Sequence, residues 1–377
     1  MNFSHIDEEL GAAVERKVFP GAVVLISHAG SVVYRRAVGS RSVDPQVSPL
    51  SEATSFDLAS LTKPLATTIA IMLMVKDKIL RLDDRVTRFF PNFGVQGKTH
   101  ITFRHLLSHS SGLSAWRPYY RDIIERETKE AKVGFLGTRS ARDFVYTQLQ
   151  REKLDAPPGQ QAVYSDLGFM LLGATIEEIS GLGLDQYCQE KIFQPLGLKS
   201  LTFINLENVR RRRFQPVVEN YAATERCPWR KRVLCAEVHD DNAYAMGGVA
   251  GHAGLFAPVD AIDRLVGVLV ACYHGAHSFI PQPVIREFWT RADIVPGSTW
   301  CLGWDSPSPQ NSSAGEYFSS HSIGHLGFTG TSLWIDLARQ VHVILLSNRV
   351  HPRRDNDKIQ MFRPALHNAA MQAVLEK

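Results

Sequence analysis

The sequence predicts an α+β fold in which an antiparallel sheet is flanked by helices and carries a mostly helical insert. β-Branched runs typical of strands occur near both ends of the chain, whereas stretches with helical periodicity fill the middle. A sheet needs three or more strands to be stable, so the N-terminal strands are expected to pair with the C-terminal ones. A discontinuous sheet domain then comprises residues 1–85 and 246–377, the helical insert comprises 86–245, and a site is expected in the cleft between them.

The N-terminal part predicts a helix, a hairpin and a second helix, in that order. Residues 5–17 are amphipathic, and residues 21–39 contain two β-branched runs joined by a turn at residues 28–31. A second helix is expected to start at Ser60, because apolar residues cover most of the segment that follows. Pro64 suits the first turn of that helix, where backbone N–H groups have no intrahelical partner.

Helices are also predicted for most of the middle of the chain. The predicted segments are residues 100–113, 118–131, 139–151, 167–181 and 184–198. Residues 205–240 are arginine-rich and show no clear period, so they are expected to wind over the surface.

The C-terminal part predicts two helices and two strands. Residues 261–275 are an apolar helix, and residues 327–349 read as a strand, a turn at residues 337–340 and a second strand. A final helix is expected from about residue 356 to residue 376, and His325 is expected where a strand begins.

Composition excludes several classes of partner. The 377 residues contain 42 Lys and Arg against 38 Asp and Glu, a net charge of +4 that is too small to favour nucleic acid. No apolar run reaches the ~18 residues that a membrane span requires. The acidic N-terminus lacks the apolar core of a signal peptide, so the chain as written is expected to be cytoplasmic, and periplasmic if its N-terminus is longer. The oligomeric state is left open.

The cysteines and histidines suggest no metal or cofactor. Five cysteines, an odd number without CxxC spacing, predict free thiols, although Cys227 and Cys235 could pair in an exported protein. No two histidines have HExxH-type spacing, and Asp240 and Asp241 are interpreted as loop carboxylates. The histidines considered and left unassigned are His105, His109, His239 and His252.

Ser60 and Lys63 form the strongest chemical signal, the one SxxK tetrapeptide of the chain. Alone, such a tetrapeptide is most simply an N-cap serine with an exposed lysine. Here it opens an apolar helix, so Lys63 is expected to lie close to apolar packing. Burying an ammonium is costly unless it is paired, and the usual result is a lowered pKa. A lysine with a lowered pKa beside a hydroxyl can generate a nucleophile.

Other stretches give the tetrapeptide its context. They are "HLLSHSSGL" (105–113), "PPGQQAVYSDLGFMLLG" (157–173), "GGVAGHAGLF" (247–256), "LGWD" (302–305) and "GHLGFTGTSLWID" (324–336). From about residue 20 to residue 350, the chain resembles the class C β-lactamase-like serine hydrolases, which include β-lactamases, D-alanyl-D-alanine peptidases and esterases. The resemblance implies the β-lactamase/transpeptidase-like fold. Its narrower form points to low-molecular-weight penicillin-binding proteins and uncharacterised hydrolases.

The resemblance implies a role for several residues. Ser60 is the expected acylated nucleophile, with Lys63 and Tyr164 as general base and proton shuttle. A phenol with a pKa near 10 is a base at neutral pH only beside a cation, here Lys63. The backbone N–H groups of Ser60 and Phe328 are the expected oxyanion hole. The alternative for Tyr164 is a half-buried tyrosine at a helix start.

Two departures from the family pattern bear on the substrate. Asp166 stands where asparagine is usual, and an ionised carboxylate can only accept hydrogen bonds. It therefore either repels anionic groups or pairs with Lys63. His325 stands where β-lactamases usually carry lysine, and histidine is mostly neutral above a pKa of about 6.5. Asp166, His325 and Gly327 are the expected substrate-binding residues, although His325 could instead be structural.

Three functions follow from these residues. The leading hypothesis is hydrolysis of a small acyl ester or amide through a Ser60 acyl-enzyme, because the site has lost a fixed positive charge. The first alternative is a D-alanyl-D-alanine carboxypeptidase or weak β-lactamase, with a peptide substrate. The second is a non-catalytic binding module that keeps the cleft for a ligand.

Overall fold

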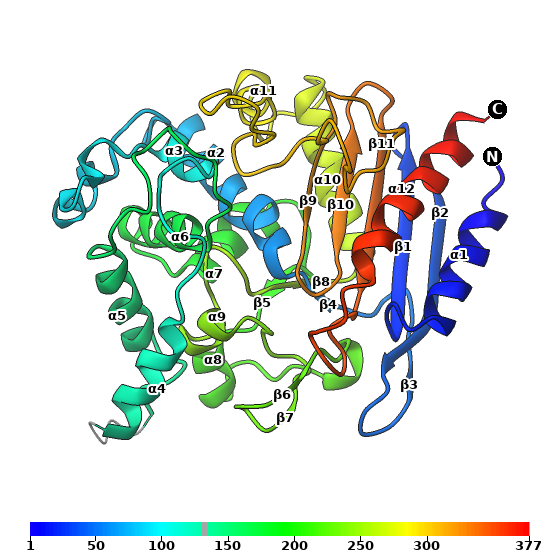
Figure 1. The fold of residues 1–377 in the computed structure, drawn as a ribbon, viewed down its shortest axis with the longest axis horizontal. Coiled ribbons are helices and arrows are strands. Elements are labelled where there is room, and N and C mark those ends of the chain that lie inside the picture. Colours follow the sequence, from blue (N-terminus) through cyan, green and yellow to red (C-terminus); the bar gives the residue numbers. More distant parts are fainter. Residues whose placement is uncertain (130–133, 377) are drawn as a thin grey trace.

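The computed structural model describes residues 1–129 and 134–376 and centres on a six-stranded antiparallel sheet (Figure 1). The strand order is β3-β2-β1-β11-β10-β9. The strands are β1 (Gly21–His28), β2 (Ser31–Ser42), β3 (Ser48–Pro49), β9 (Ile323–Leu326), β10 (Ser332–Asp336) and β11 (Val341–Ser347). The N-terminal hairpin pairs with the C-terminal strands through β1 and β11, so the predicted α+β fold class is confirmed.

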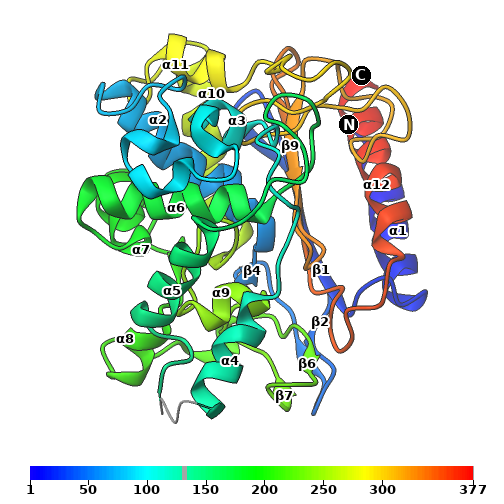
Figure 2. The same ribbon diagram turned by 60° about the vertical axis from the view of Figure 1, so that its left-hand side comes forward.

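Both faces of the central strands are buried. Val24 and its partner Leu345 point to one core, whereas the neighbouring pair Leu25 and Ile344 points to the other. Helices α1 (Ser4–Glu15) and α12 (Ile359–Leu375) cover the first face, and α10 (Val259–Tyr273) packs on the second (Figure 2). Burial on both sides explains why these strands are apolar runs without polar alternation.

The second face supports the larger core and the helical part of the molecule. Its helices are α2 (Ile69–Lys76), α3 (Phe103–Leu107), α4 (Tyr119–Lys129), α5 (Arg139–Leu149), α6 (Asp166–Ser180), α7 (Leu184–Cys188), α8 (Leu206–Arg210), α9 (Asp241–Ala245) and α11 (Gln282–Phe288). The last two residues of the predicted helix 118–131 lie outside the described residues. Helix α6 is buried along most of its length and ends at Gly181, whose φ of 69° is typical of a helix C-terminus.

A small three-stranded sheet connects the two predicted parts of the chain. Strands β4 (Phe56–Asp57) and β5 (Thr202–Phe203) both pair with β8 (Leu255–Ala257). Strand β5 belongs to the predicted insert, and strands β4 and β8 belong to the predicted sheet domain. The boundaries of the two domains stay a prediction.

Three sequence expectations are wrong in detail. Ser60 does not begin an α-helix: it lies in a 3₁₀ turn (Ala59–Leu61) followed by a π-helical turn (Lys63–Thr68), and α2 starts only at Ile69. His325 lies near the end of β9, not at the beginning of a strand. The segment 205–240 contains α8 and a hairpin of two-residue strands, β6 (Arg226–Cys227) and β7 (Arg232–Val233), which are too short to show a period.

The cysteines and helices add two observations. All five cysteines are free, as the odd count and spacing predicted. Within residues 1–129 and 134–376, no single helix is long and apolar enough to cross a membrane. Helix α6 and the helical segment Leu184–Phe193 meet that test only together, and they are bent by 75°.

Candidate active site

The backbone around Ser60 is held in a strained turn. Ala59, the preceding residue, has a φ of 46°, a left-handed conformation that costs free energy for residues with a side chain. The Asp57 carboxylate stabilises this turn by accepting a hydrogen bond of 2.8 Å from the Ala59 N–H. The Ser60 N–H lies in the first turn of the 3₁₀ helix, where an N–H group has no intrahelical acceptor. It is therefore free to donate to a substrate oxygen.

Lys63 is fully buried and is surrounded by acceptors. Its Nζ lies 3.0 Å from Ser60 Oγ, 2.6 Å from the Tyr164 hydroxyl and 2.7 Å from Asp166 Oδ1. It also donates to the carbonyl oxygen of His252 at 3.3 Å. The structure thus brings the predicted nucleophile, lysine and tyrosine into direct contact, and Asp166 joins them.

The expectation of a lowered Lys63 pKa is wrong. Burial lowers the pKa, but the Asp166 carboxylate and the Tyr164 oxygen outweigh burial and raise it above its ordinary value. Burial, with a contribution from the Asp166 charge, also raises the pKa of Tyr164, although Lys63 lowers it. At neutral pH the resting site therefore contains the Lys63 ammonium beside Asp166 and a neutral Tyr164 phenol. The missing information was which way Asp166, 103 residues away in the sequence, turns: the structure pairs it with Lys63.

Tyr164 and Asp166 flank the residue that caps helix α6. Ser165 Oγ accepts a hydrogen bond from the Gly168 N–H at 3.2 Å and donates to the Ser114 carbonyl at 2.7 Å. This cap fixes the start of α6, so that Tyr164 and Asp166, on either side of Ser165, both reach Lys63. Of the two possibilities for Asp166, the structure shows pairing with Lys63.

His325 is buried and neutral. Its Nδ1 lies 2.8 Å from the carbonyl oxygen of Leu326, and burial, with a contribution from the Lys63 charge, lowers its pKa to about 3. Because Nδ1–H donates to that carbonyl, Nε2 carries a lone pair, and it has no partner among the described residues. A fixed positive charge is therefore absent at this position, as the sequence suggested.

The turn between β9 and β10 carries Phe328 and is braced from two sides. A Cβ added at Gly327 would lie 2.0 Å from Thr331 Oγ1 and 2.6 Å from the Leu58 carbonyl, so only glycine fits there. Arg363, on α12, donates to the carbonyl oxygens of Gly327 and Thr331 at 2.7 and 2.8 Å. Within the described chain, the Phe328 N–H donates no backbone hydrogen bond, as an oxyanion donor requires.

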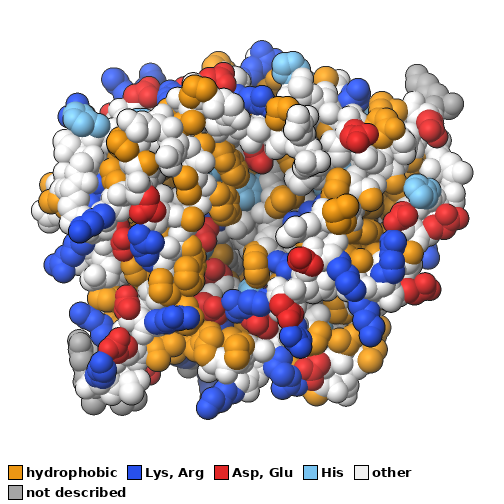
Figure 3. All heavy atoms as spheres, viewed as in Figure 1, with side chains coloured by type: hydrophobic (Ala, Val, Ile, Leu, Met, Phe, Trp, Pro, Cys, Tyr) orange, Lys and Arg blue, Asp and Glu red, His pale blue; other side chains and the backbone are white. Residues whose placement is uncertain are grey.

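A cavity of about 340 Å³ opens onto Ser60. The face of the molecule in Figure 3 is hollowed near its centre, and acidic and basic side chains are mixed around it. The cavity is lined by Ala59, Ser60, Trp116, Tyr164, Asp166, His239, Asp240, Asp241, His252, Ala253, Phe328 and Arg354. Lys63, His325 and Gly327 do not line the cavity. Gly327 and His325 therefore act on the site through the residues that line it.

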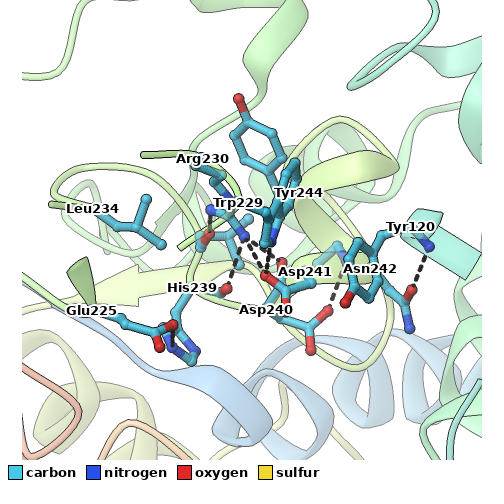
Figure 4. Close-up of polar contacts among 12 residues, drawn as sticks. Tyr120, Glu225, Trp229, Arg230, Leu234, His239, Asp240, Asp241, Asn242 and Tyr244 are labelled. Carbon is cyan, nitrogen blue, oxygen red and sulfur yellow. Dashed lines mark hydrogen bonds and ion pairs between the residues drawn. The ribbon is translucent and has the colours of Figure 1, made fainter. Parts of the chain in front are cut away.

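Sequence reasoning missed one wall of this cavity. Figure 4 shows its core: the Arg230 guanidinium is paired with Asp241 at 3.1 Å and donates to the carbonyl oxygens of Val238 and His239. His239 Nε2 lies 3.2 Å from Glu225 Oε2, which also pairs with Arg354. The stretch "VHDDNAYAMGG" (238–248), which leads directly into "GGVAGHAGLF", was the available signal.

Three of the histidines left unassigned from the sequence lie at or beside the cavity. His239 and His252 line the cavity, and the His109 ring lies 4.7 Å from the Tyr164 ring. His109 Nδ1 accepts the Ser165 N–H at 3.0 Å, so this buried histidine helps to position the tyrosine segment. His105, by contrast, caps α3. In the part of the chain that the structure describes, no three His, Cys, Asp or Glu side chains form a group that could hold a metal ion.

Comparison with known proteins identifies the family of this site. The model of the Beta-lactamase family matches residues 6–365. A relative in Escherichia coli K12 with the provisional name D-alanyl-D-alanine carboxypeptidase is 31% identical over 360 residues, which are 88% of this chain and 79% of the relative. The N-acetylmuramyl-L-alanine amidase of Bacillus subtilis 168 is 32% identical over 369 residues, 90% of this chain and 80% of the amidase.

Solved structures show the same fold. The octameric penicillin-binding protein homologue from Pyrococcus abyssi superposes with a TM-score of 0.71 at 22% identity, covering 99% of this chain and 77% of that one. EstCE1, a hydrolase with promiscuous acyltransferase activity, gives 0.71 at 21% identity over 98% of both chains. At this identity the likeness concerns the fold alone.

Proposed function

The chain belongs to the Beta-lactamase family of serine hydrolases, and on that premise we propose that it hydrolyses small acyl esters or amides through an acyl-enzyme on Ser60. The observation that carries the proposal is the contact of one buried ammonium, Lys63, with Ser60, Tyr164 and Asp166. A non-catalytic module would not need this arrangement, whose lysine is costly to bury.

Acylation begins with a proton shift inside the ion pair. Lys63 passes one proton to Asp166, and the neutral amine takes the proton of Ser60 as Oγ forms a bond to the acyl carbon. The resulting oxyanion accepts hydrogen bonds from the N–H groups of Ser60 and Phe328. The Tyr164 hydroxyl protonates the leaving alcohol or amine and recovers its proton from Lys63, 2.6 Å away. Water then releases the acyl group by the reverse sequence of proton transfers.

The charges around the cavity support a substrate without a carboxylate. Asp166, Asp240 and Asp241 line it, and Arg354 is its one lining guanidinium. That guanidinium is already paired with Glu225 and Asp241, and Lys63 is paired with Asp166. No unpaired cation among the lining residues is left to meet an anionic group, so a substrate carboxylate would be repelled.

A second candidate is a peptidase or amidase acting on cell-wall fragments. The relatives named D-alanyl-D-alanine carboxypeptidase and N-acetylmuramyl-L-alanine amidase, each more than 30% identical, favour it. Both names describe cleavage of an amide bond, which the same acyl-enzyme chemistry performs.

Side-by-side kinetics on p-nitrophenyl butyrate and nitrocefin separate the candidates. The proposal expects rapid turnover of the ester, little cleavage of nitrocefin, and loss of both activities in Ser60→Ala. Efficient cleavage of nitrocefin, or its accumulation as a stable adduct, would instead favour the peptidase. Ester hydrolysis that survives in Ser60→Ala would contradict the proposal.

A further inference from the structure

Asp240 presents a carboxylate oxygen to the cavity that contains Ser60. The residue caps α9, and its Oδ1 accepts the Ala243 N–H at 2.7 Å and lies 2.9 Å from His252 Nε2. Both contacts fall on the same oxygen. Oδ2 has no hydrogen-bond partner within the described residues, and a quarter of the side chain is exposed, at 25%. Since Asp240 lines the cavity, Oδ2 is open to a bound molecule.

The neighbouring carboxylates are already engaged by cations. Asp241 lies within 3.3 Å of both Arg230 and Arg354, and Asp166 is paired with Lys63. Figure 4 shows the Asp241 carboxyl joined to Arg230, whereas the Asp240 carboxyl points away from that guanidinium. Asp240 therefore differs from the other two in lacking a cationic side chain of Lys or Arg as partner among the described residues.

Asp240 is rigidly connected to the catalytic turn. The imidazole of His252 contacts the Asp240 carboxylate. His252 is 1% exposed, and its carbonyl oxygen accepts a hydrogen bond from Lys63 Nζ. Asp57 accepts the His239 N–H at 2.6 Å and also holds the turn before Ser60. Burial opposes ionisation of Asp240, but His252 and the Ala243 N–H outweigh it and hold its pKa below the usual range. The oxygen is thus a fixed, ionised acceptor.

We propose that Asp240 Oδ2 accepts a hydrogen bond from an N–H group of the substrate, close to the acyl carbon that Ser60 attacks. The inference rests on the proposed acyl-enzyme and adds a substrate class: acyl groups that carry an amino or acylamino substituent. An ionised carboxylate can only accept, and hydrogen bonds to charged groups are strong. A plain acyl chain would displace water from this oxygen without offering a hydrogen bond in its place. Leaving a polar group of the site unpaired in this way lowers kcat/KM strongly.

Matched substrate pairs test the inference. The p-nitrophenyl esters of N-acetylglycine and levulinic acid differ only in an N–H that becomes a CH₂. A second pair, the p-nitroanilides of alanine and 2-methylpropionic acid, replaces an ammonium by a methyl group and so distinguishes a charged donor from a neutral one. The readout is the ratio of kcat/KM within each pair, which does not depend on the fraction of folded enzyme.

Asp240→Ser is the informative variant, because serine also caps helices while it removes the carboxylate. We expect the wild-type ratio to exceed that of Asp240→Ser about tenfold or more in at least one pair. Asp77→Asn, a change at a half-exposed and remote carboxylate, should keep the wild-type ratios. It controls for the loss of one negative charge.

The outcomes separate the inference from the function beneath it. If the wild type and Asp240→Ser show the same ratios while hydrolysis still requires Ser60, the inference is overturned and the proposed function stands. If hydrolysis of all four compounds is absent or independent of Ser60, both fail. A changed ratio in the ester pair alone identifies a neutral N–H donor, and one in the anilide pair alone identifies an ammonium.

Discussion

The charge on Lys63 depends most strongly on one neighbour, Asp166. The two side chains lie 2.7 Å apart, with the Lys63 side chain fully buried and that of Asp166 18% exposed. In Asp166→Asn the lysine keeps its burial but loses its counter-charge, so its pKa should fall. No carboxylate is left to take the lysine proton, so the neutral amine forms only by losing that proton to solvent, and we expect the acid limb of kcat/KM for p-nitrophenyl butyrate to move up by at least about one pH unit.

The pH–rate profile of Asp77→Asn is the control for this shift, because that carboxylate is remote from the cavity. An acid limb that stays in place in Asp166→Asn, or moves to lower pH, would show that Asp166 is not the group that takes the Lys63 proton during acylation.

The sequence could predict the local part of this site but not its charge state. Ser60 and Lys63 are three residues apart, so one turn of any helix brings them together. Tyr164 and Phe328 were found through motifs. The pairing of Asp166 with Lys63 was one of two open possibilities, because no local rule says which way the carboxylate turns. Asp240 was missed because its role depends on His252, with which it pairs only in the folded chain.

At the scale of elements, helix α12 supports the turn that carries Phe328. Arg363, which is 7% exposed, reaches the Gly327 and Thr331 carbonyls. In Arg363→Met the turn loses both hydrogen bonds, and the Phe328 N–H is no longer held in place. We expect kcat to fall about tenfold or more with a much smaller change in KM, since an oxyanion donor acts mainly in the transition state.

Arg363→Lys, which can still donate to one of the two carbonyls, should recover part of kcat. Thermal denaturation of both variants establishes that they are folded. Equal changes in kcat and KM, or no change in either, would contradict a positioning role for Arg363.

Short elements explain most of what the sequence did not predict about the fold. The sequence predicted the longer elements, because each shows a periodic pattern over eight or more residues or an apolar run nearly as long. These elements are strands β1 and β11 and helices α6, α10 and α12. Strand β9 has four residues, and α9 and α11 have five and seven, which is too few for a period to show. Their positions are set by tertiary contacts.

At the scale of the whole molecule, buried neutral histidines should make the fold sensitive to acid. Burial lowers the pKa of His367 to about 4 and that of His325 to about 3. An unfolded histidine has a pKa near 6.5, so between these values the unfolded chain binds more protons and stability falls as pH falls. From pH 7 to pH 5 each histidine should remove roughly 2 kcal/mol from the free energy of unfolding.

Urea denaturation at pH 7 and pH 5 measures this loss. His367 lies away from the cavity and contacts Ser332 and Ser313, so His367→Gln removes one titrating group without altering the site. The loss between the two pH values should be smaller in this variant by roughly 2 kcal/mol. Identical losses in the variant and the wild type would contradict the assignment of His367 as a buried neutral group.

The most direct test of the whole account is to locate the covalent adduct formed with a fluorophosphonate. We predict one adduct per chain, on the peptide that contains Ser60, with loss of ester hydrolysis in proportion to labelling and no labelling of Ser60→Ala. An adduct on another residue, or ester hydrolysis that continues in the fully labelled protein, would contradict the assignment of Ser60 as the nucleophile.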